Sequence, residues 1–125
     1  MDKYQKRLIR QFDSNRVLWQ TILQSGVVTQ ETPLAINFVF YASSEKKAKN
    51  LAHALTQKGY TISISRKPRW FWKQWTIEGD APPTQYTFEK LQEWTAEMVI
   101  ASKMYDVEFD GWGVLLPKAP ATEAV

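Results

Sequence analysis

The sequence contains no cysteine and only one histidine, His53, among its 125 residues. The absence of cysteine excludes disulfides, thiolate nucleophiles and cysteine-ligated zinc. His53 stands between two alanines in a predicted helix, and we interpret it as a partly exposed residue without a chemical role. The chain also lacks a phosphate-binding P-loop, a dinucleotide-binding glycine motif and a nucleophile elbow. These absences argue against an enzyme, and we expect no cofactor and no metal.

Long apolar stretches are missing as well. No run approaches the roughly 20 residues of a membrane-spanning helix, and no apolar signal core follows the charged N-terminal residues. We therefore expect a cytoplasmic protein without a membrane partner. The length fits one domain with a core of its own, which we place at 1–116. Residues 117–125 have little to bury and are predicted to form a flexible tail.

The net charge of +3 conceals an asymmetry along the chain. Residues 1–73 contain 13 Lys and Arg but 4 Asp and Glu, a net of +9, whereas residues 74–125 contain 3 and 9, a net of −6. If the fold keeps these halves apart, the protein offers a basic and an acidic surface to its partners.

The first predicted element is a helix over 14–25, where apolar residues recur at helical spacing. Asp13 or Ser14 can cap its start, and Gly26 can end it in a left-handed conformation. Residues 3–12 carry a similar spacing and can add further turns of helix.

The middle of the chain predicts a strand, a helix and a hairpin. Residues 33–42 are apolar and rich in strand-forming residues. A helix follows the cap Ser43 and ends at Gly59. Residues 60–67 are predicted to form a strand, since Ile62 and Ile64 alternate with Thr61, Ser63 and Ser65, and 69–79 form the next strand, paired with it.

The last two elements are a helix over 87–105 and a strand over 106–116. The complete order is helix, β, α, β, β, α, β. Split βαβ units in this order form an α+β, ferredoxin-like sandwich, here with an extra N-terminal helix. Two helices cover one face of a four-stranded antiparallel sheet, and the N-terminal helix, a partner or water covers the other face.

An acidic column is predicted on the last helix. Glu89, Glu93 and Glu97 are spaced by four residues, so they share one face, and like charges at this spacing slightly weaken an isolated helix. A solvated face explains them, and a docking strip for a basic partner explains them as well. The strand residues Asp106 and Glu108 are candidates to extend such a strip.

The segment "DVEFDGWGV" combines alternating carboxylates with a tryptophan between two glycines. Asp106, Glu108 and Asp110 alternate with apolar residues and lie about 6.5–7 Å apart along a strand, which suits hard cations weakly and a solvated face better. The flanking glycines permit a bend that directs Trp112. We expect Trp112 to be seated against the end of the sheet; a surface role is the alternative.

A basic and aromatic stretch, "SRKPRWFWKQW", supports a different function. Cations hold phosphates and flat rings stack on bases in proteins that bind single-stranded nucleic acid. If Trp75 and Ile77 pack under the helices, alternation places Trp70 and Trp72 on the open face of the sheet. The alternative is that these rings pack under the N-terminal helix. The candidate RNA-binding residues are Arg66, Lys67, Arg69, Trp70 and Trp72.

The segment "SKMYDVEFDGWGV" closely resembles the C-terminal signature of the RraB family, protein regulators of ribonuclease E. Weaker similarity runs through "NRVLWQTILQSG" and "AHALTQKGYTI", so the resemblance covers about 14–116 and is specific at 103–113. The matching signature residues are Asp106, Glu108, Asp110, Gly111, Trp112 and Gly113.

The resemblance implies a ferredoxin-like, non-catalytic protein that binds the scaffold half of an RNA-degrading endonuclease and lowers or retunes its activity. The family's well-known member is strongly acidic, whereas the first 73 residues of this chain are basic. Two functions therefore fit the sequence. The first is a regulator of RNA turnover that acts by protein–protein contact, with Glu89, Glu93, Glu97, Asp106 and Glu108 as its candidate interface. The second is a single-stranded RNA-binding module using 66–75.

Overall fold

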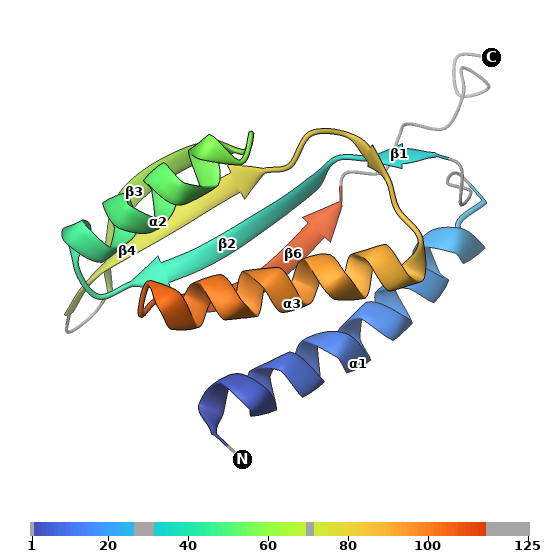
Figure 1. Cartoon of the computed structure of the whole chain (residues 1–125), viewed down its shortest axis with the longest axis horizontal. Coiled ribbons are helices and arrows are strands. Elements are labelled where there is room, and N and C mark those ends of the chain that lie inside the picture. The colour runs from blue at the N-terminus through green and yellow to red at the C-terminus, as the bar shows by residue number, and fades with distance from the viewer. Residues whose placement is uncertain (1, 27–31, 70–71, 115–125) are drawn as a thin grey trace.

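The computed structural model describes residues 2–26, 32–69 and 72–114, and it describes no side chains for 67–69 and 72–73. It is a mixed α+β fold with three helices and two antiparallel sheets (Figure 1). In chain order, the elements are α1 (Lys3–Gln24), β1 (Pro33–Leu34), β2 (Ile36–Ala42), α2 (Glu45–Gln57), β3 (Thr61–Arg69), β4 (Trp72–Asp80), β5 (Thr84–Gln85), α3 (Phe88–Met104) and β6 (Glu108–Val114).

The main sheet has four antiparallel strands in the order β3-β4-β2-β6. The predicted hairpin is confirmed, since Thr61 pairs with Asp80 and Arg69 with Trp72. A second sheet of two short strands, β1 and β5, was not predicted. The apolar run 33–42 is divided at Ala35 between the two sheets, because Pro33 and Leu34 pair with Gln85 and Thr84 after the Pro82-Pro83 break.

The helix starts differ from the prediction at two places. α1 is one continuous helix whose cap is Asp2, and Asp2 and Gln5 satisfy each other's backbone amides in a capping box. Asp13 and Ser14 are therefore interior residues, and the prediction that either begins the helix is wrong. α2 begins at Ser44, whose side chain accepts from the Lys47 amide, and not at Ser43. Asp13 and Ser14 are residue types that often begin helices, so the sequence predicted a start there. In the structure, α1 begins well before them, because its first turns also pack against the rest of the fold.

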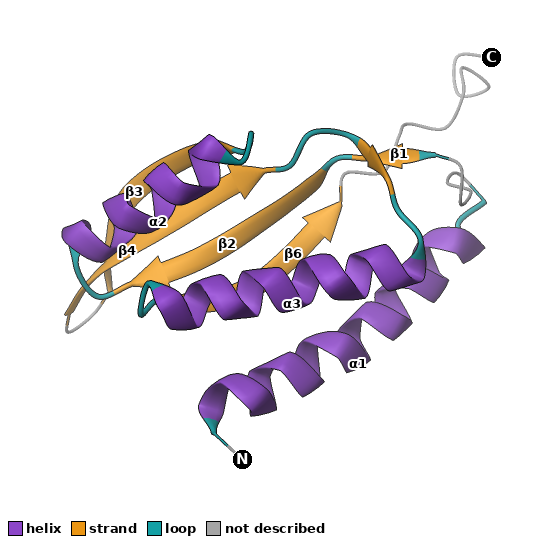
Figure 2. Ribbon diagram, in the orientation of Figure 1, coloured by secondary structure: helices purple, strands orange, loops and turns teal. Residues whose placement is uncertain are grey.

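The core lies between the main sheet and the helices α2 and α3 (Figure 2). Phe38 and Phe40 of β2 and Phe109 of β6 are at most 1% exposed. Their rings meet one another and those of Trp94 and Tyr60 at centroid distances of 5.0–6.3 Å, in edge or tilted geometry. Aromatic contacts of this kind add about 0.5–1.5 kcal/mol per pair beyond the area they bury. This cluster fixes β2 in the centre of the fold.

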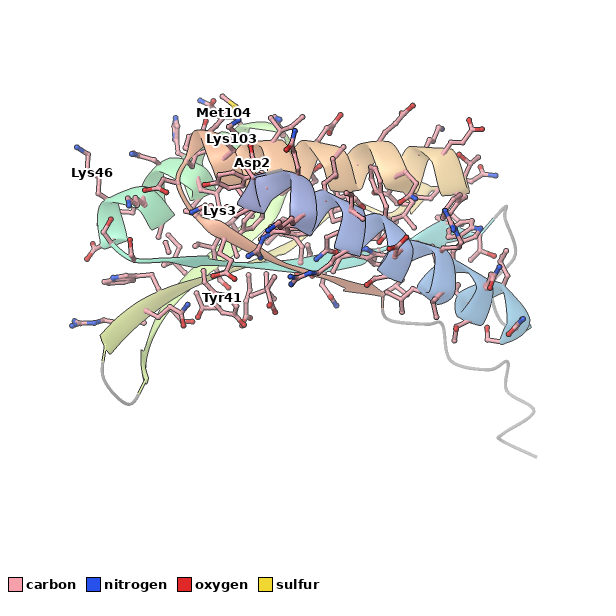
Figure 3. All side chains as sticks on the ribbon, turned by 90° about the horizontal axis from the view of Figure 1, so that it is seen from below. Asp2, Lys3, Tyr41, Lys46, Lys103 and Met104 are labelled. Carbon is pink, nitrogen blue, oxygen red and sulfur yellow. The ribbon has the colours of Figure 1, made fainter. Side chains whose placement is uncertain are left out.

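α1 does not cover the second face of the sheet. It lies beside α3, as Figure 1 shows. Side-chain hydrogen bonds from Arg7 and Asn15 connect it to β6, so its inner side closes one edge of the sandwich. In Figure 3, α2 and α3 stand on one side of the sheet. No helix of the described residues covers the opposite side, which carries mostly small polar and acidic side chains. The sequence left the N-terminal helix, a partner or water as the cover of that face. Since α1 lies elsewhere, a partner or water covers it.

Candidate functional site

The three glutamates of α3 form an exposed column on successive helical turns. Glu89, Glu93 and Glu97 are all exposed, and none of them forms an ion pair with a described residue. Repulsion at this spacing costs a few tenths of a kcal/mol per pair. We call these three residues the acidic column. Its charges are available to a cationic partner.

The C-terminal end of the acidic column lies near the turn between α2 and β3. Burial raises the pKa of Tyr60, and the negative charge of Glu97 raises it further, against the opposing effect of the Trp94 hydrogen bond. That bond runs from Trp94 Nε1 to the Tyr60 hydroxyl over 3.1 Å. Tyr60 immediately precedes β3, so the acidic column approaches the first residues of this strand.

Asp106 and Glu108 do not belong to the acidic column. Lys47 Nζ donates to Asp106 over 2.5 Å, and Arg7 donates to the Glu108 carboxylate over 2.9 Å. The hydrogen bond and the charge of Lys47 hold the pKa of Asp106 below its ordinary value of 3.8. Asp106 also adopts a left-handed backbone, with φ of 53°, in the turn before β6. It therefore lies outside the strand in which it was predicted, and both carboxylates already have cationic partners.

These two ion pairs border an open cleft of about 520 Å³. The cleft lies between the start of α1, the end of β2, the start of α2 and the turn before β6. Lys3 and Tyr41 face it from α1 and β2, and both are labelled in Figure 3. The cations and carboxylates that line it neutralise one another pairwise, which leaves Lys3 as the lining cation without an ion pair among the described residues.

The glycine-flanked tryptophan lies beside a β-bulge. Phe109 pairs with Phe40 and Gly111 with Val39, so Asp110 is an extra residue on β6. Gly111 has φ of 142°, which side-chain-bearing residues rarely adopt. The extra residue reverses the alternation, and Trp112 therefore pairs with Phe38 on the same face as Phe109. Without the bulge, Trp112 would point to the uncovered face of the sheet.

Trp112 is held by a buried asparagine of α1. Its Nε1 donates to Asn15 Oδ1 over 2.6 Å, and the Asn15 amide nitrogen donates to Gln92 and Thr95 of α3 over 2.7 and 2.8 Å. Asn15 is 0% exposed and Thr95 is buried, whereas Trp112 and Gln92 are half-buried, and the bonds of this one amide join α1, α3 and β6. The seating of Trp112 against the sheet is as predicted, but Asn15 was not predicted as its partner. Asn15 lies four residues before Trp19 and seven before Ile22, and this helical spacing was the signal in the sequence that it shares their buried face.

Of the predicted RNA-binding residues, Arg66, Lys67, Arg69 and Trp72 belong to the outer half of the β3–β4 hairpin. β2 pairs with β4 only as far as Trp75. The pairs Lys67–Gln74, Pro68–Lys73 and Arg69–Trp72 therefore form a two-stranded extension of β3 and β4 past the end of β2. The Arg66 guanidinium lies over the Trp75 ring at 5.6 Å. Trp70, and the side chains of Lys67, Arg69 and Trp72, lie outside the described part. Ile77 is buried as expected, and Trp75 packs against the core.

No metal site is formed by the described residues, since no group of three His, Asp or Glu side chains is close enough to hold an ion. His53 is exposed on α2, where its Nε2 lies 3.0 Å from the Gln57 amide nitrogen. Among the helices within 2–26, 32–69 and 72–114, none has both the length and the apolar character of a membrane span.

The sequence of this chain matches one known protein family over most of its length. The family described as Regulator of ribonuclease activity B, RraB, matches residues 12–114. The chain belongs to the RraB family. The match includes Asn15, the acidic column and the Gly111-Trp112-Gly113 bulge, and it agrees with the extent expected from the signature. The family name identifies its members as regulators of ribonuclease activity. No curated protein sequence matches the chain.

Proposed function

We propose that this RraB-family chain is a cytoplasmic, non-catalytic regulator of RNA turnover that binds a ribonuclease of the ribonuclease E type. It lowers or retunes the activity of that enzyme by protein–protein contact. The family match over residues 12–114 is the observation that carries the proposal. The chain acts as one domain over 1–116, because the match ends at 114 and α1 continues the domain back to Lys3.

The same proposal assigns the fold to the ferredoxin-like class. The main sheet places its last strand, β6, beside its first, β2, and the hairpin β3–β4 on the other side of β2. Each helix, α2 and α3, connects two strands that are not neighbours in the sheet. This is the arrangement that two interlocked βαβ units produce. α1 and the small β1–β5 sheet are additions to it.

The acidic column is the proposed docking strip for the ribonuclease. Glu89, Glu93 and Glu97 are exposed and have no ion pair within the described residues, so they can meet a cationic surface without first breaking an internal contact. Asp106 and Glu108 are weaker contributors, because each would have to exchange Lys47 or Arg7 for the partner. Charges at the rim of an interface mainly speed association and set its salt dependence.

The test is affinity capture from host lysate with the tagged chain after complete nuclease treatment. The proposal expects a ribonuclease to be retained when no RNA remains, and its activity on a model RNA to change when purified chain is added. Loss of the ribonuclease after nuclease treatment would show that RNA bridges the two proteins, and the proposal would then fail.

A second candidate function is direct binding of single-stranded RNA. The observation that favours it is the outer half of the β3–β4 hairpin, where Arg66 lies over Trp75 at the end of β2 and both strands continue past β2. The test is tryptophan fluorescence during titration with a polypyrimidine oligomer at increasing salt. Saturable quenching that weakens steeply with salt supports RNA binding. A flat titration leaves the protein-binding function.

A further inference from the structure

The fold covers one edge of its main sheet and leaves the other open. At the β6 edge, Arg7 of α1 donates to the Phe109 carbonyl over 2.6 Å, and the Gln11 side chain lies beside Gly111. Asn15 binds Trp112 further along the same strand. α1 thus satisfies or shields the backbone of this edge, as proteins commonly do to prevent pairing with other chains.

The opposite edge is the outer side of β3. β3 pairs with β4 alone, and the backbone groups of Thr61–Ser65 that point outward have no hydrogen-bond partner among the described residues. Figure 1 shows β3 as the outermost strand, with α2 in front of it. Such an edge can accept another strand through main-chain hydrogen bonds.

Only the first half of this edge is unprotected. Residues 66–69 are Arg, Lys, Pro and Arg, and charges or proline on an edge strand oppose strand addition. Residues 61–65 are Thr, Ile, Ser, Ile and Ser, which are uncharged and favour strands. The half-buried Ile62 and Ile64 lie on the helix-covered side, and the exposed Thr61, Ser63 and Ser65 lie on the uncovered side. The open edge is therefore five residues long.

An acidic hollow of about 420 Å³ lies on the uncovered face next to this edge. Glu78 and Asp80 line it, and none of its lining residues carries a positive charge. Glu78 pairs with Ser63 and Asp80 with Thr61, so both carboxylates stand one strand inward from the edge. The side chains between them and the edge are small. A long arginine or lysine side chain on an added strand can reach across Thr61 and Ser63 to these carboxylates, since neighbouring strands are about 4.8 Å apart.

We propose that Thr61–Ser65 binds an extended segment of the protein partner by strand addition, and that this segment alternates apolar residues with Arg or Lys. The apolar residues continue the layer of Ile62 and Ile64 beside α2, and the cations reach Glu78 and Asp80. The inference rests on the proposed function, and it defines the chemistry of the ribonuclease segment that is bound. The acidic column meets the same partner from α3, whose Glu97 lies near the start of β3.

The first test uses a capped peptide of three Val-Arg repeats and the full chain, followed by amide chemical shifts. The peptide should shift the signals of 61–65 and 78–80, whereas a Val-Glu peptide should bind at least tenfold more weakly. Two further peptides carry N-methyl groups on all Val or on all Arg amides. Because successive amides of a strand point to opposite sides, one methylated peptide should lose binding and the other should keep it. Equal binding by both, or shifts centred on α3, would overturn strand addition.

The second test compares two matched pairs of charge removals. Glu78→Gln with Asp80→Asn should weaken the Val-Arg peptide about fivefold, the effect expected for two partly exposed charge pairs. Asp13→Asn with Glu45→Gln removes the same charge from two exposed positions outside both candidate surfaces and should change affinity less than twofold. A reversed order of effects would contradict the proposal. Light scattering tests whether a second copy of this chain, and not a partner segment, binds the β3 edge. A dimer that Ser63→Lys converts to a monomer would overturn the proposal.

The failure of this inference can be separated from that of the proposed function. If the Glu78 and Asp80 variant still captures the ribonuclease from nuclease-treated lysate, whereas reversal of Glu93 and Glu97 does not, the regulator function stands and the strand site fails. If the peptide binds at β3 but no ribonuclease is captured, the strand site stands and the identity of its partner fails.

Discussion

Trp112 and Asn15, 97 positions apart in the sequence, share a hydrogen bond that joins the last strand to the first helix. Asn15 uses its oxygen for Trp112 and its nitrogen for Gln92 and Thr95, so one buried amide connects three elements. The family signature around Trp112 therefore has a structural role in this chain, because its tryptophan helps to hold α1 against the sandwich.

Replacing Asn15 by alanine should destabilise the protein by about 1–3 kcal/mol, because the half-buried Trp112 N–H loses its acceptor and a cavity forms at the buried Asn15. Urea unfolding followed by circular dichroism measures this loss. Ser14→Ala, an exposed neighbour on the same helix, is the control and should change stability by less than about 0.5 kcal/mol. Equal stability of the Asn15 variant and the wild type would show that the network contributes nothing.

Gly111→Ala should cost about 1–3 kcal/mol, because an alanine must adopt the unfavourable φ of 142°. The indole N–H resonance of Trp112 should shift as the bulge relaxes. Gly113→Ala is the matched control, since its added Cβ would meet only the exposed Asn37 side chain at 2.9 Å, which can rotate away. If the control is the more damaging of the two, the bulge does not depend on Gly111.

The Lys47–Asp106 pair should make stability depend on pH in the acid range. The folded state holds the pKa of Asp106 below 3.8, so the pair stabilises above that pH and is lost as pH falls through the lower folded value. Lys47→Met should flatten the dependence of Tm on pH between about pH 5 and 2.5. Lys46→Met, which removes an exposed cation next to it, should leave the slope unchanged. A Lys47 variant with the wild-type slope would contradict this account.

Charge reversal separates the regulator function from direct RNA binding. Glu93→Lys with Glu97→Lys should slow association with the ribonuclease and alter its salt dependence while leaving the fold intact, because exposed charges contribute under about 1 kcal/mol. Arg66→Glu with Arg69→Glu should abolish RNA binding if the chain binds RNA, and should spare the ribonuclease contact. Kinetic binding assays measure both. If the arginine variant alone loses the ribonuclease, the acidic column is not the docking strip.

The sequence predicted much of this architecture because its periodic segments are long. The strict alternation of β3, the apolar stripes of α2 and α3 and the proline punctuation predicted the order of the larger elements, to which the structure adds the short strands β1 and β5. The α+β class and the four-stranded antiparallel sheet are confirmed. Helix starts were less predictable, since Asp2, Asp13 and Ser14 are all acceptable caps, and the contacts of α1 with α3 and β6 favour the earliest of them.

The site was predicted in part. The spacing of Glu89, Glu93 and Glu97 was sufficient to place them on one exposed face. The pairing of Asp106 with Lys47 depends on a turn that brings residues 59 positions apart together, and no local pattern reports it. The bulge at Asp110 could not be predicted from the alternation of apolar and polar residues either, because a bulge interrupts the two-residue period on which that prediction depends. The glycine pair signalled a bend but not its direction.

The central position of β2 has a consequence for biosynthesis. β2 pairs on one side with β4 and on the other with β6, so that Ile36 lies opposite Val114. Contacts between residues this distant in sequence form late and slow folding, because a long loop must close before they are gained. During translation, β2 therefore leaves the ribosome with both of its edges unpaired, and α1 emerges long before the α3 helix against which it packs. The β4 edge of this apolar strand can pair once residue 80 has emerged, whereas the β6 edge stays unpaired until almost the whole domain has been made.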